Sequence, residues 1–334
     1  MTKRKTVAAK RREALVQKKI EKRSDRHNPV TSEERREDMR REDILNHLLV
    51  SLGIAGGYIN YLSCDSTNNF LKKISQSMMM QKNRANNQIV KPPNFMNNID
   101  DWMIYKLTPD NLPFVMTADE QTAGRGRQSN TWWTGPGSLA LSMLLDAKQH
   151  GLKPQTSAQL SLAIGYAAMQ ALRRITEETL AQVGTTALPN IEIRWPNDVY
   201  VNDRKITGIL IEMPNMHHTI IGIGVNTNNT AVDAPEDICD RIITLNDVLS
   251  RKIDQDRFIY LLCREIMEIL NEFPLQIPQL IEKIEANLYQ TGKMVNISCE
   301  NEQISGKCQG LNPDGSLRVL AEAGEKAVVS GVIV

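Results

Sequence analysis

Several features that mark specialised protein classes are missing from this chain of 334 residues. No apolar run approaches the ~18 residues that a membrane-spanning helix requires, and no basic segment leads into an apolar one as in a secretory signal. The five cysteines form no CxxC pair, which favours free thiols over a disulfide or zinc framework. We therefore expect a cytoplasmic protein, outside the membrane and without a metal held by its own side chains.

Two familiar nucleotide-binding loops are also absent from the sequence. It has no GxxxxGK[ST] loop, and the glycines of residues 222–224 do not join a strand to a helix in the GxGxxG pattern. If a nucleotide binds, loop amides and side-chain cations must hold its phosphates.

The net charge of +1 conceals a basic N-terminal segment. Residues 1–43 contain fifteen Lys and Arg against nine Asp and Glu, and almost no large apolar side chains. Such a segment buries too little surface to fold alone, so we expect residues 1–45 to form a disordered or helical extension. A nucleic-acid-binding arm is the sharper alternative. The interspersed acidic residues make it the weaker hypothesis, and they also disfavour a mitochondrial presequence.

Apolar periodicity predicts an α+β fold with a mixed, largely antiparallel sheet flanked by helices. Strands are expected at 114–118 and 138–145, and helical spacing follows at 156–180. The next strands succeed one another without intervening helices, which favours an antiparallel meander over a βαβ alternation. They cover residues 191–195, 199–201, 205–213 and 219–225, and two more helices are expected around 256–273 and 278–289.

The sequence also predicts the division into domains. From residue 291 short strands separated by turns such as NPDGS predict a small C-terminal β-barrel. We place this domain at 289–334 and the larger one at 46–288. Within the larger domain, residues 75–110 are rich in Met, Asn and Gln and contain Pro92-Pro93. They resemble an inserted surface loop.

The stretch QTAGRGRQSNTWW has the features of an anion-binding loop. Gly124 and Gly126 let backbone N–H groups approach a ligand closely. Arg125 and Arg127 add planar cations that match carboxylate and phosphate oxygens. Trp132 can supply a stacking face for a purine, or it can belong to the core at the end of the loop.

A second polar cluster lies in RWPNDVYVNDRKITG. A hairpin turn at residues 202–203 pairs residues whose numbers sum to about 405. The expected pairs include Val199 with Ile206 and Asp198 with Thr207, so Lys205 begins its strand near Asp198. An exposed surface lysine is the alternative for Lys205. Asn197 stands at the mouth of the strand, Gly208 permits close approach of a ligand, and Asn226 ends the last strand of the meander.

Taken in order, these clusters resemble the biotin protein ligase family. That family has an STN step, QTAGRGR followed by tryptophan, [KR]WPND, KxxGILxE and GIGxN. All occur here in the same order, as Ser66-Thr67-Asn68, Gln121 to Arg127, Arg194 to Asp198, Lys205 to Glu212, and Gly222 to Asn226. The resemblance covers roughly residues 58–334. It implies a ligase domain of the class II synthetase type followed by the small β domain.

The resemblance implies two half-reactions. Biotin and ATP, with Mg²⁺, form biotinyl-5′-AMP and pyrophosphate, and a lysine of a biotin carboxyl carrier protein then attacks the adenylate. It further implies biotin-binding residues (Ser66, Thr67, Asn68, Gln121, Gly124, Arg125, Lys205, Gly208), nucleotide-binding residues (Arg127, Trp132, Asn197, Asn226) and catalytic residues (Lys205, Arg125, Arg127, Asp198). Asp198 could orient Lys205, hold the metal or accept the proton of the incoming lysine, and these alternatives stay open.

The chain also departs from the family pattern. The separation between Ser66 and Gln121 is long, and the basic segment does not have the pattern of a winged helix-turn-helix, so repressor activity is not carried over. Two alternatives remain: a lipoate or octanoate ligase of the same fold, and a ligand-responsive regulator that binds nucleic acid. Nucleic-acid binding is not expected, and the question of a homodimer is left open.

Overall fold

The computed structural model describes residues 32–84, 107–185, 187–300 and 302–333. The chain divides into two compact units, residues 1–44 and 45–334. Most of the first unit lies outside the described residues, and so does most of the predicted basic extension. From residue 32 the chain is helical, in α2 (Ser32–Ser51). No helix in the described ranges has the length and apolar character needed to cross a membrane.

The second unit is built on a seven-stranded sheet with the order β1-β2-β3-β7-β6-β5-β4. Only β1 and β2 pair in parallel, so the predicted mixed, largely antiparallel sheet is confirmed. The predicted meander is confirmed as well, because β4, β5, β6 and β7 pair in succession. The strands are β1 (Gly57–Cys64), β2 (Phe114–Gln121), β3 (Leu139–Asp146), β4 (Ile191–Arg194), β5 (Asp198–Val201), β6 (Arg204–Glu212) and β7 (His218–Val225).

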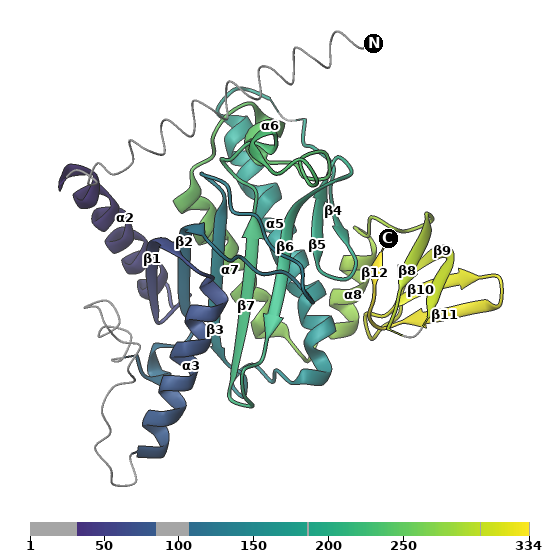
Figure 1. Cartoon of the computed structure of the whole chain (residues 1–334), viewed down its shortest axis with the longest axis horizontal. Helices are drawn as coiled ribbons and strands as arrows, with labels where there is room; N and C mark the ends of the chain where they lie inside the picture. Colours follow the sequence, from purple (N-terminus) through teal and green to yellow (C-terminus); the bar gives the residue numbers. More distant parts are fainter. Residues whose placement is uncertain (1–31, 85–106, 186, 301, 334) are drawn as a thin grey trace. The chain divides into compact units, whose positions relative to one another are not determined.

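Helices cover both faces of this sheet (Figure 1). Successive side chains of a strand point to opposite faces, and β2 shows the result. Val115 packs in the large core with α5 (Ser157–Ala181) and α7 (Gln255–Glu272). Its neighbour Met116 packs in a second core with α3 (Thr67–Arg84). Further helices are α6 (Leu245–Leu249), α8 (Ile277–Glu285) and the 3₁₀ turns η2 (Pro109–Asn111), η3 (Pro154–Thr156) and η4 (Ala231–Asp233).

The expected inserted loop at 75–110 is wrong at its start, where α3 continues to Arg84. Leu71, Ile74 and Met78 lie on one face of this helix and are buried against the sheet. The consecutive methionines hid that spacing, because only the first of them belongs to the buried face. Residues 85–106 lie outside the described residues, so the rest of the predicted insertion is not described.

The β5–β6 hairpin is confirmed, but its register changes part-way along. Both turn residues, Asn202 and Asp203, have positive φ (47° and 64°), which suits a tight hairpin. Beside the turn, Tyr200 pairs with Lys205 as the sum of 405 predicts. The register then shifts, so both expected pairings, Val199 with Ile206 and Asp198 with Thr207, are wrong. Val199 pairs with Thr207, and Asp198 pairs with Gly208. A β-bulge, which the sequence did not reveal, causes the shift.

A five-stranded antiparallel sheet forms the C-terminal part, in the order β11-β10-β9-β8-β12. Side chains of β9 alternate between exposed and buried, which is the pattern of a sheet with one face on a core. The predicted C-terminal β domain is thus confirmed, as a sheet whose two outer strands are β11 and β12. The strands are β8 (Met294–Ser298), β9 (Gln303–Leu311), β10 (Leu317–Ala321), β11 (Gly324–Val328) and β12 (Val332–Ile333).

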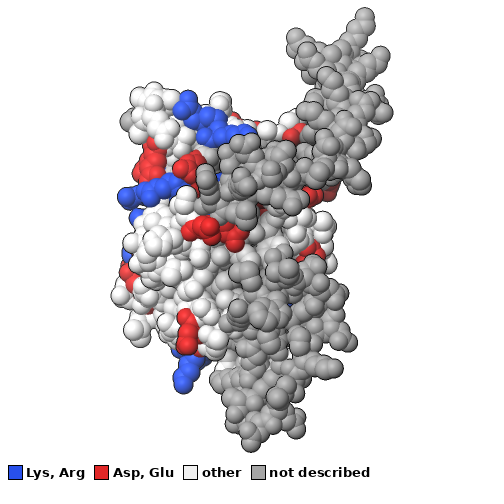
Figure 2. All heavy atoms as spheres, turned by 90° about the vertical axis from the view of Figure 1, so that its left-hand side faces the viewer, with Lys and Arg blue, Asp and Glu red and all other residues white. Residues whose placement is uncertain are grey.

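Charged residues of both signs are scattered over the described part of one face of the molecule. On the face drawn in Figure 2, the described Lys and Arg side chains lie interspersed with Asp and Glu. Charges of opposite sign weaken each other's field, whereas a nucleic-acid footprint is a stripe of one sign. The described residues of this face therefore resemble an ordinary solvated surface.

Candidate active site

A row of very small residues forms a hollow on the α3 face of the large sheet. On β7 the residues that point to this face are His218, Ile220, Gly222 and Gly224, so side-chain bulk decreases along the strand. Gly224 pairs with Gly208 on β6 and with Ala140 on β3. Because directly paired residues share a face of the sheet, these three form a floor with almost no side chains.

The β-bulge places two charged residues beside this floor. Asp198 shares the face of its partner Gly208, while Ile206 and Thr207 on β6 are both fully buried. Lys205 therefore returns to the cavity side, where its Nζ lies 2.8 Å from a carboxylate oxygen of Asp198. Bulges next to functional sites commonly redirect a side chain in this way.

One end of the cavity is a wall of uncharged side chains, which we call the polar wall (Thr67, Asn68, Gln121 and, behind them, Ser142). Gln121 Oε1 accepts a hydrogen bond from the Thr67 backbone N–H at 2.9 Å. Ser142 Oγ lies 2.6 Å from both Thr67 Oγ1 and Asn68 Oδ1. Donors and acceptors fixed in this way suit a neutral ligand that carries both N–H and C=O groups.

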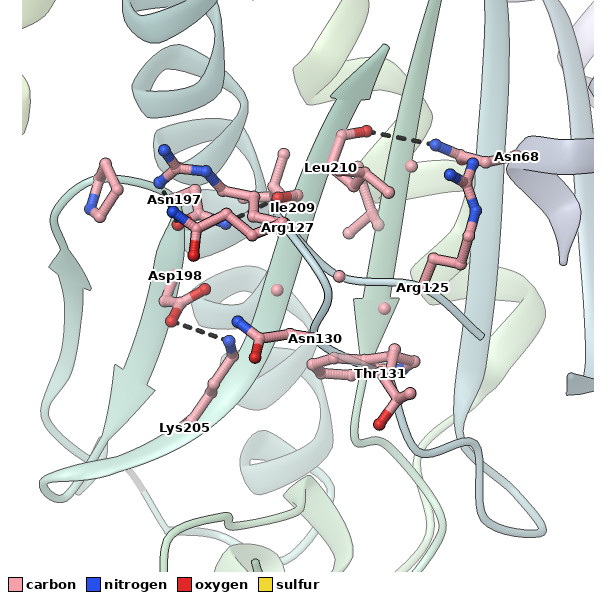
Figure 3. A pocket seen from close by; sticks show the side chains of 18 of the residues that line it. Asn68, Arg125, Arg127, Asn130, Thr131, Asn197, Asp198, Lys205, Ile209 and Leu210 are labelled. Carbon is pink, nitrogen blue, oxygen red and sulfur yellow. Dashed lines mark hydrogen bonds and ion pairs between the residues drawn. The ribbon is translucent and has the colours of Figure 1, made fainter. Parts of the chain in front are cut away.

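Arg125 joins the polar wall through a carboxylate. Glu212, at the end of β6, forms an ion pair with the Arg125 guanidinium. The same carboxylate oxygen accepts a hydrogen bond from Asn68 Nδ2 at 2.9 Å. Figure 3 shows Arg125 and Asn68 together, on the opposite side of the cavity from Asp198 and Lys205.

The other end holds the Lys205–Asp198 pair, Arg127 and Asn197, which we call the ion-pair end (Figure 3). Arg127 donates to Asn197 Oδ1 at 3.3 Å, and Asn197 Nδ2 donates to the Ile209 carbonyl at 2.7 Å. Burial lowers the pKa of Arg127 and the nearby Asp198 carboxylate opposes the shift; the group stays cationic at neutral pH. The second oxygen of Asp198, Oδ1, is buried and has no hydrogen-bond partner among the described residues.

Trp132 lies against the floor between the two ends. Side chains built on Gly208 or Gly224 would collide with its ring, and Lys205 Nζ lies 5.7 Å from the ring centroid. Its Nε1 is buried without a hydrogen-bond partner in the described part of the chain. The indole therefore packs on the sheet and also lines the cavity, while its use as a stacking face for a purine stays a prediction.

Most of the predicted site residues line this one cavity. They are Ser66, Thr67, Asn68, Gln121, Arg125, Arg127, Trp132, Asn197, Asp198, Lys205 and Gly208. Gly124 and Asn226 do not line it. A side chain at Gly124 would collide with the Trp132 carbonyl oxygen, so this glycine permits the loop to close on itself. Asn226 is buried, and its Oδ1 accepts a hydrogen bond from Asn229.

Sequence reasoning missed several residues of the site. Ser142 is a lone hydroxyl in an apolar strand, and that contrast was the available signal. Glu212 was part of a quoted motif but was given no role. Arg194 and the C-terminal residues 331–333 also line the cavity. Residues 331–333 lie in and directly before β12 of the second sheet. No local sequence pattern predicts that a segment so far away in the chain reaches the cavity.

Two family models match the chain. One, described as the biotin/lipoate A/B protein ligase family, matches residues 102–226, and the other, described as the biotin protein ligase C-terminal domain, matches residues 291–334. The chain is also 30% identical over 240 residues to the bifunctional ligase/repressor BirA of Bacillus spizizenii, covering 69% of each protein. The chain belongs to the biotin protein ligase family.

Other members of the biotin protein ligase family are similarly distant. The biotin–[acetyl-CoA-carboxylase] ligase of Mycobacterium tuberculosis is 27% identical over 217 residues, which cover 64% of this chain and 75% of that protein. The solved structure of the biotin protein ligase of Aquifex aeolicus in complex with biotin and ATP matches with a TM-score of 0.62 at 28% identity. It covers 83% of this chain and 97% of the Aquifex protein.

Proposed function

We propose that this chain is an ATP-dependent biotin protein ligase. It joins biotin to the AMP moiety of ATP, releases pyrophosphate, and transfers biotin to a lysine of a biotin carboxyl carrier protein. The observation that carries the proposal is that one cavity has an uncharged polar wall at one end and charged side chains at the other. The polar wall offers amides and hydroxyls for the neutral ureido ring of biotin, and the ion-pair end offers cations for phosphates.

The first half-reaction brings two anions together. A carboxylate oxygen of biotin attacks the α-phosphorus of ATP, and the bond from that phosphorus to the bridging oxygen of pyrophosphate breaks. Two unit charges 4 Å apart repel by about 4 kcal/mol at an effective dielectric constant of 20. Lys205 and Arg127 lie where they can offset this repulsion and the charge that develops on phosphorus-bound oxygens.

The residues of the ion-pair end also fit the Mg²⁺ that accompanies ATP. The unpartnered Asp198 Oδ1 is a hard oxygen ligand. The preceding residue, Asn197, carries a second oxygen, Oδ1, which accepts a hydrogen bond from Arg127. Mg²⁺ bound to a nucleotide takes many of its ligands from phosphates and water, and a single carboxylate can complete such a site. Mg²⁺ would supply charge neutralisation at the phosphates, with Asp198 as its protein ligand.

In the second half-reaction the lysine amine of the carrier attacks the carbonyl carbon of the adenylate. An amide bond forms, the bond to the AMP oxygen breaks, and the nitrogen loses a proton. We assign Asp198 as the group that receives this proton, because its Oδ1 has free acceptor capacity. Asp198 would hold Mg²⁺ only in the first half-reaction, so that Oδ1 would be available as a proton acceptor in the second. Because the proposed partner is a biotin carboxyl carrier protein, we expect this chain to act in the cytoplasm. A homodimer of the chain stays a prediction.

Biotin-dependent exchange of labelled pyrophosphate into ATP tests the proposal. We expect exchange with biotin, at least a hundredfold less with lipoate or octanoate, and none without a carboxylate substrate. Transfer is then followed by mass spectrometry of a biotin carboxyl carrier domain, with its target lysine changed to arginine as the control. Faster exchange with lipoate than with biotin would assign the chain to the other branch of the fold, and an absence of exchange with every acid would refute the proposal.

A further inference from the structure

Glu212 stands outside the cavity yet connects two of its parts. It lies on β6, opposite Ile220 of β7, and is not among the residues that line the cavity. Its side chain is only 18% exposed. One oxygen of its carboxylate contacts both the guanidinium of Arg125 and the side-chain amide of Asn68. Arg125 belongs to the loop after β2 and Asn68 to the first turn of α3, so one oxygen atom ties together segments far apart in the chain.

The hydrogen bonds of the Asn68 side chain to Glu212, Ser142 and the Leu210 carbonyl define which way its amide points. Its Nδ2 donates to Glu212, and its Oδ1 lies 2.6 Å from the hydroxyl of Ser142. A carboxylate can only accept, so the amide nitrogen must face Glu212 and the amide oxygen must face Ser142. Without Glu212, only the longer contact from Asn68 Nδ2 to the Leu210 carbonyl, at 3.5 Å, would hold the amide nitrogen on this side.

Two cations that line the cavity, Arg125 and Lys205, each have a carboxylate partner. Glu212 offsets the charge of Arg125, and Asp198 offsets that of Lys205. Arg127 instead contacts an uncharged amide, that of Asn197. Arg125 lies with Asn68 on the opposite side of the cavity from Asp198 and Lys205, so we expect it to contribute less to nucleotide binding than Arg127. Its place is with the polar wall.

We infer that Glu212 is a positioning residue for biotin: it fixes the Asn68 amide and the Arg125 guanidinium so that the polar wall matches a neutral, hydrogen-bonding ring. This inference rests on the proposed function and refines it. Glu212 acts through its two partners and not on the reacting atoms. Its loss therefore weakens biotin binding and leaves ATP binding and the chemistry at the ion-pair end largely intact.

The test measures biotin binding to the full-length chain by calorimetry, and the KM values for biotin and ATP by pyrophosphate exchange. We expect Glu212→Gln to weaken biotin binding at least tenfold and to change the KM for ATP less than threefold. Glu212→Asp, which keeps the charge, should recover part of the loss. Glu178→Gln is the matched control, because Glu178 also pairs with an arginine, Arg257, but lies away from the cavity. It should leave both constants unchanged.

A second variant guards against misfolding, since Glu212→Gln leaves Arg125 without its counter-charge. The double variant Arg125→Gln/Glu212→Gln removes both charges, and it should show the same selective loss of biotin binding. The inference is overturned if the folded variants bind biotin within twofold of the unaltered chain, or if the KM for ATP rises as much as that for biotin. A wild-type chain that binds no biotin would refute the proposed function instead.

Discussion

The polar wall and the ion-pair end use different means to hold their side chains. The polar wall draws Thr67, Asn68, Gln121 and Ser142 from three elements and fixes them by contacts among uncharged groups, with the Glu212 carboxylate as a charged partner of Asn68. The ion-pair end takes Asp198 and Lys205 from a single hairpin. A wall assembled from distant segments depends on the whole fold, whereas the charged pair depends on one local bulge.

The difference matters because the two ends have different tasks. Hydrogen bonds between neutral groups each contribute only about 1 kcal/mol net, and they select a ligand by the pattern of its donors and acceptors. A cation directed at developing charge in a water-poor site contributes more, about 2.7–4 kcal/mol for a single donor. We therefore expect changes at the polar wall to alter which acid binds, and changes at the ion-pair end to alter how fast it reacts.

The largest effect is expected from Lys205→Ala. Loss of the ammonium should reduce the rate of biotinyl-adenylate formation by about 10²–10³-fold, while biotin binding measured by calorimetry changes less than tenfold. Lys293→Ala is the matched control. That lysine lies 3.3 Å from the Tyr289 ring centroid, is about half exposed and does not line the cavity. If Lys205→Ala weakens biotin binding as much as it slows adenylate formation, Lys205 acts in biotin recognition together with the polar wall.

Two glycines on β7 allow the polar wall and Trp132 to be perturbed separately. A methyl group at Gly222 would collide with the Asn68 side chain, and one at Gly224 with the Trp132 ring. Such overpacking typically costs about 1–3 kcal/mol. We expect Gly222→Ala to raise the KM for biotin about tenfold or more, and Gly224→Ala to change tryptophan fluorescence and raise the KM for ATP.

Gly165→Ala is the control for both glycine variants. It lies in α5, where an added methyl would meet Ile209 at an ordinary 3.6 Å, and alanine favours a helix over glycine by about 1 kcal/mol. This variant should fold at least as well as the original chain and keep both KM values. If Gly222→Ala and Gly224→Ala raise the same KM, the two ends are not separable.

A smaller effect is expected from Ser142→Ala, which removes one hydroxyl from behind the polar wall. Asn68 Oδ1 loses its partner, at a cost of about 1–1.5 kcal/mol or roughly tenfold in biotin binding. Ser142→Cys keeps a weak donor of similar size and should lose less. Calorimetry with biotin gives the comparison, and ATP titration should give the same constant for all three proteins. Unchanged biotin binding in Ser142→Ala would show that Ser142 has no part in biotin recognition by the polar wall.

Much of the fold could be predicted because local rules determine it. The meander from β4 to β7 follows from continuous apolar runs and a two-residue turn. The Lys205–Asp198 contact was also predicted, although the register near Asp198 was wrong. A bulge adds one residue without a sequence signal, and here it brings the lysine to the cavity side.

The polar wall was only partly predictable, for a different reason. Thr67 and Gln121 were identified from motifs. Ser142 and Glu212, in contrast, contact Asn68 from positions 74 and 144 residues away in the sequence. Contacts of that range are decided by strand order, which periodicity does not specify. The consecutive methionines of α3 were misread for a similar reason, since the sheet determines which of them is buried.

The smallest effect concerns an ion pair with no part in the cavity. The hydrogen bond from Arg257 holds the pKa of Glu178 below its ordinary value of 4.5. A group whose pKa is depressed by folding stabilises the folded chain above its unfolded pKa and loses that contribution as the pH falls through the folded value. Glu178 is partly exposed, so Glu178→Gln should lower the free energy of unfolding at pH 7 by at most about 1 kcal/mol. Urea titrations should show the difference between the two proteins vanishing below the depressed pKa, with pyrophosphate exchange unaffected at pH 7. A difference that persists at low pH would mean that Glu178 stabilises the chain by packing and not by its charge.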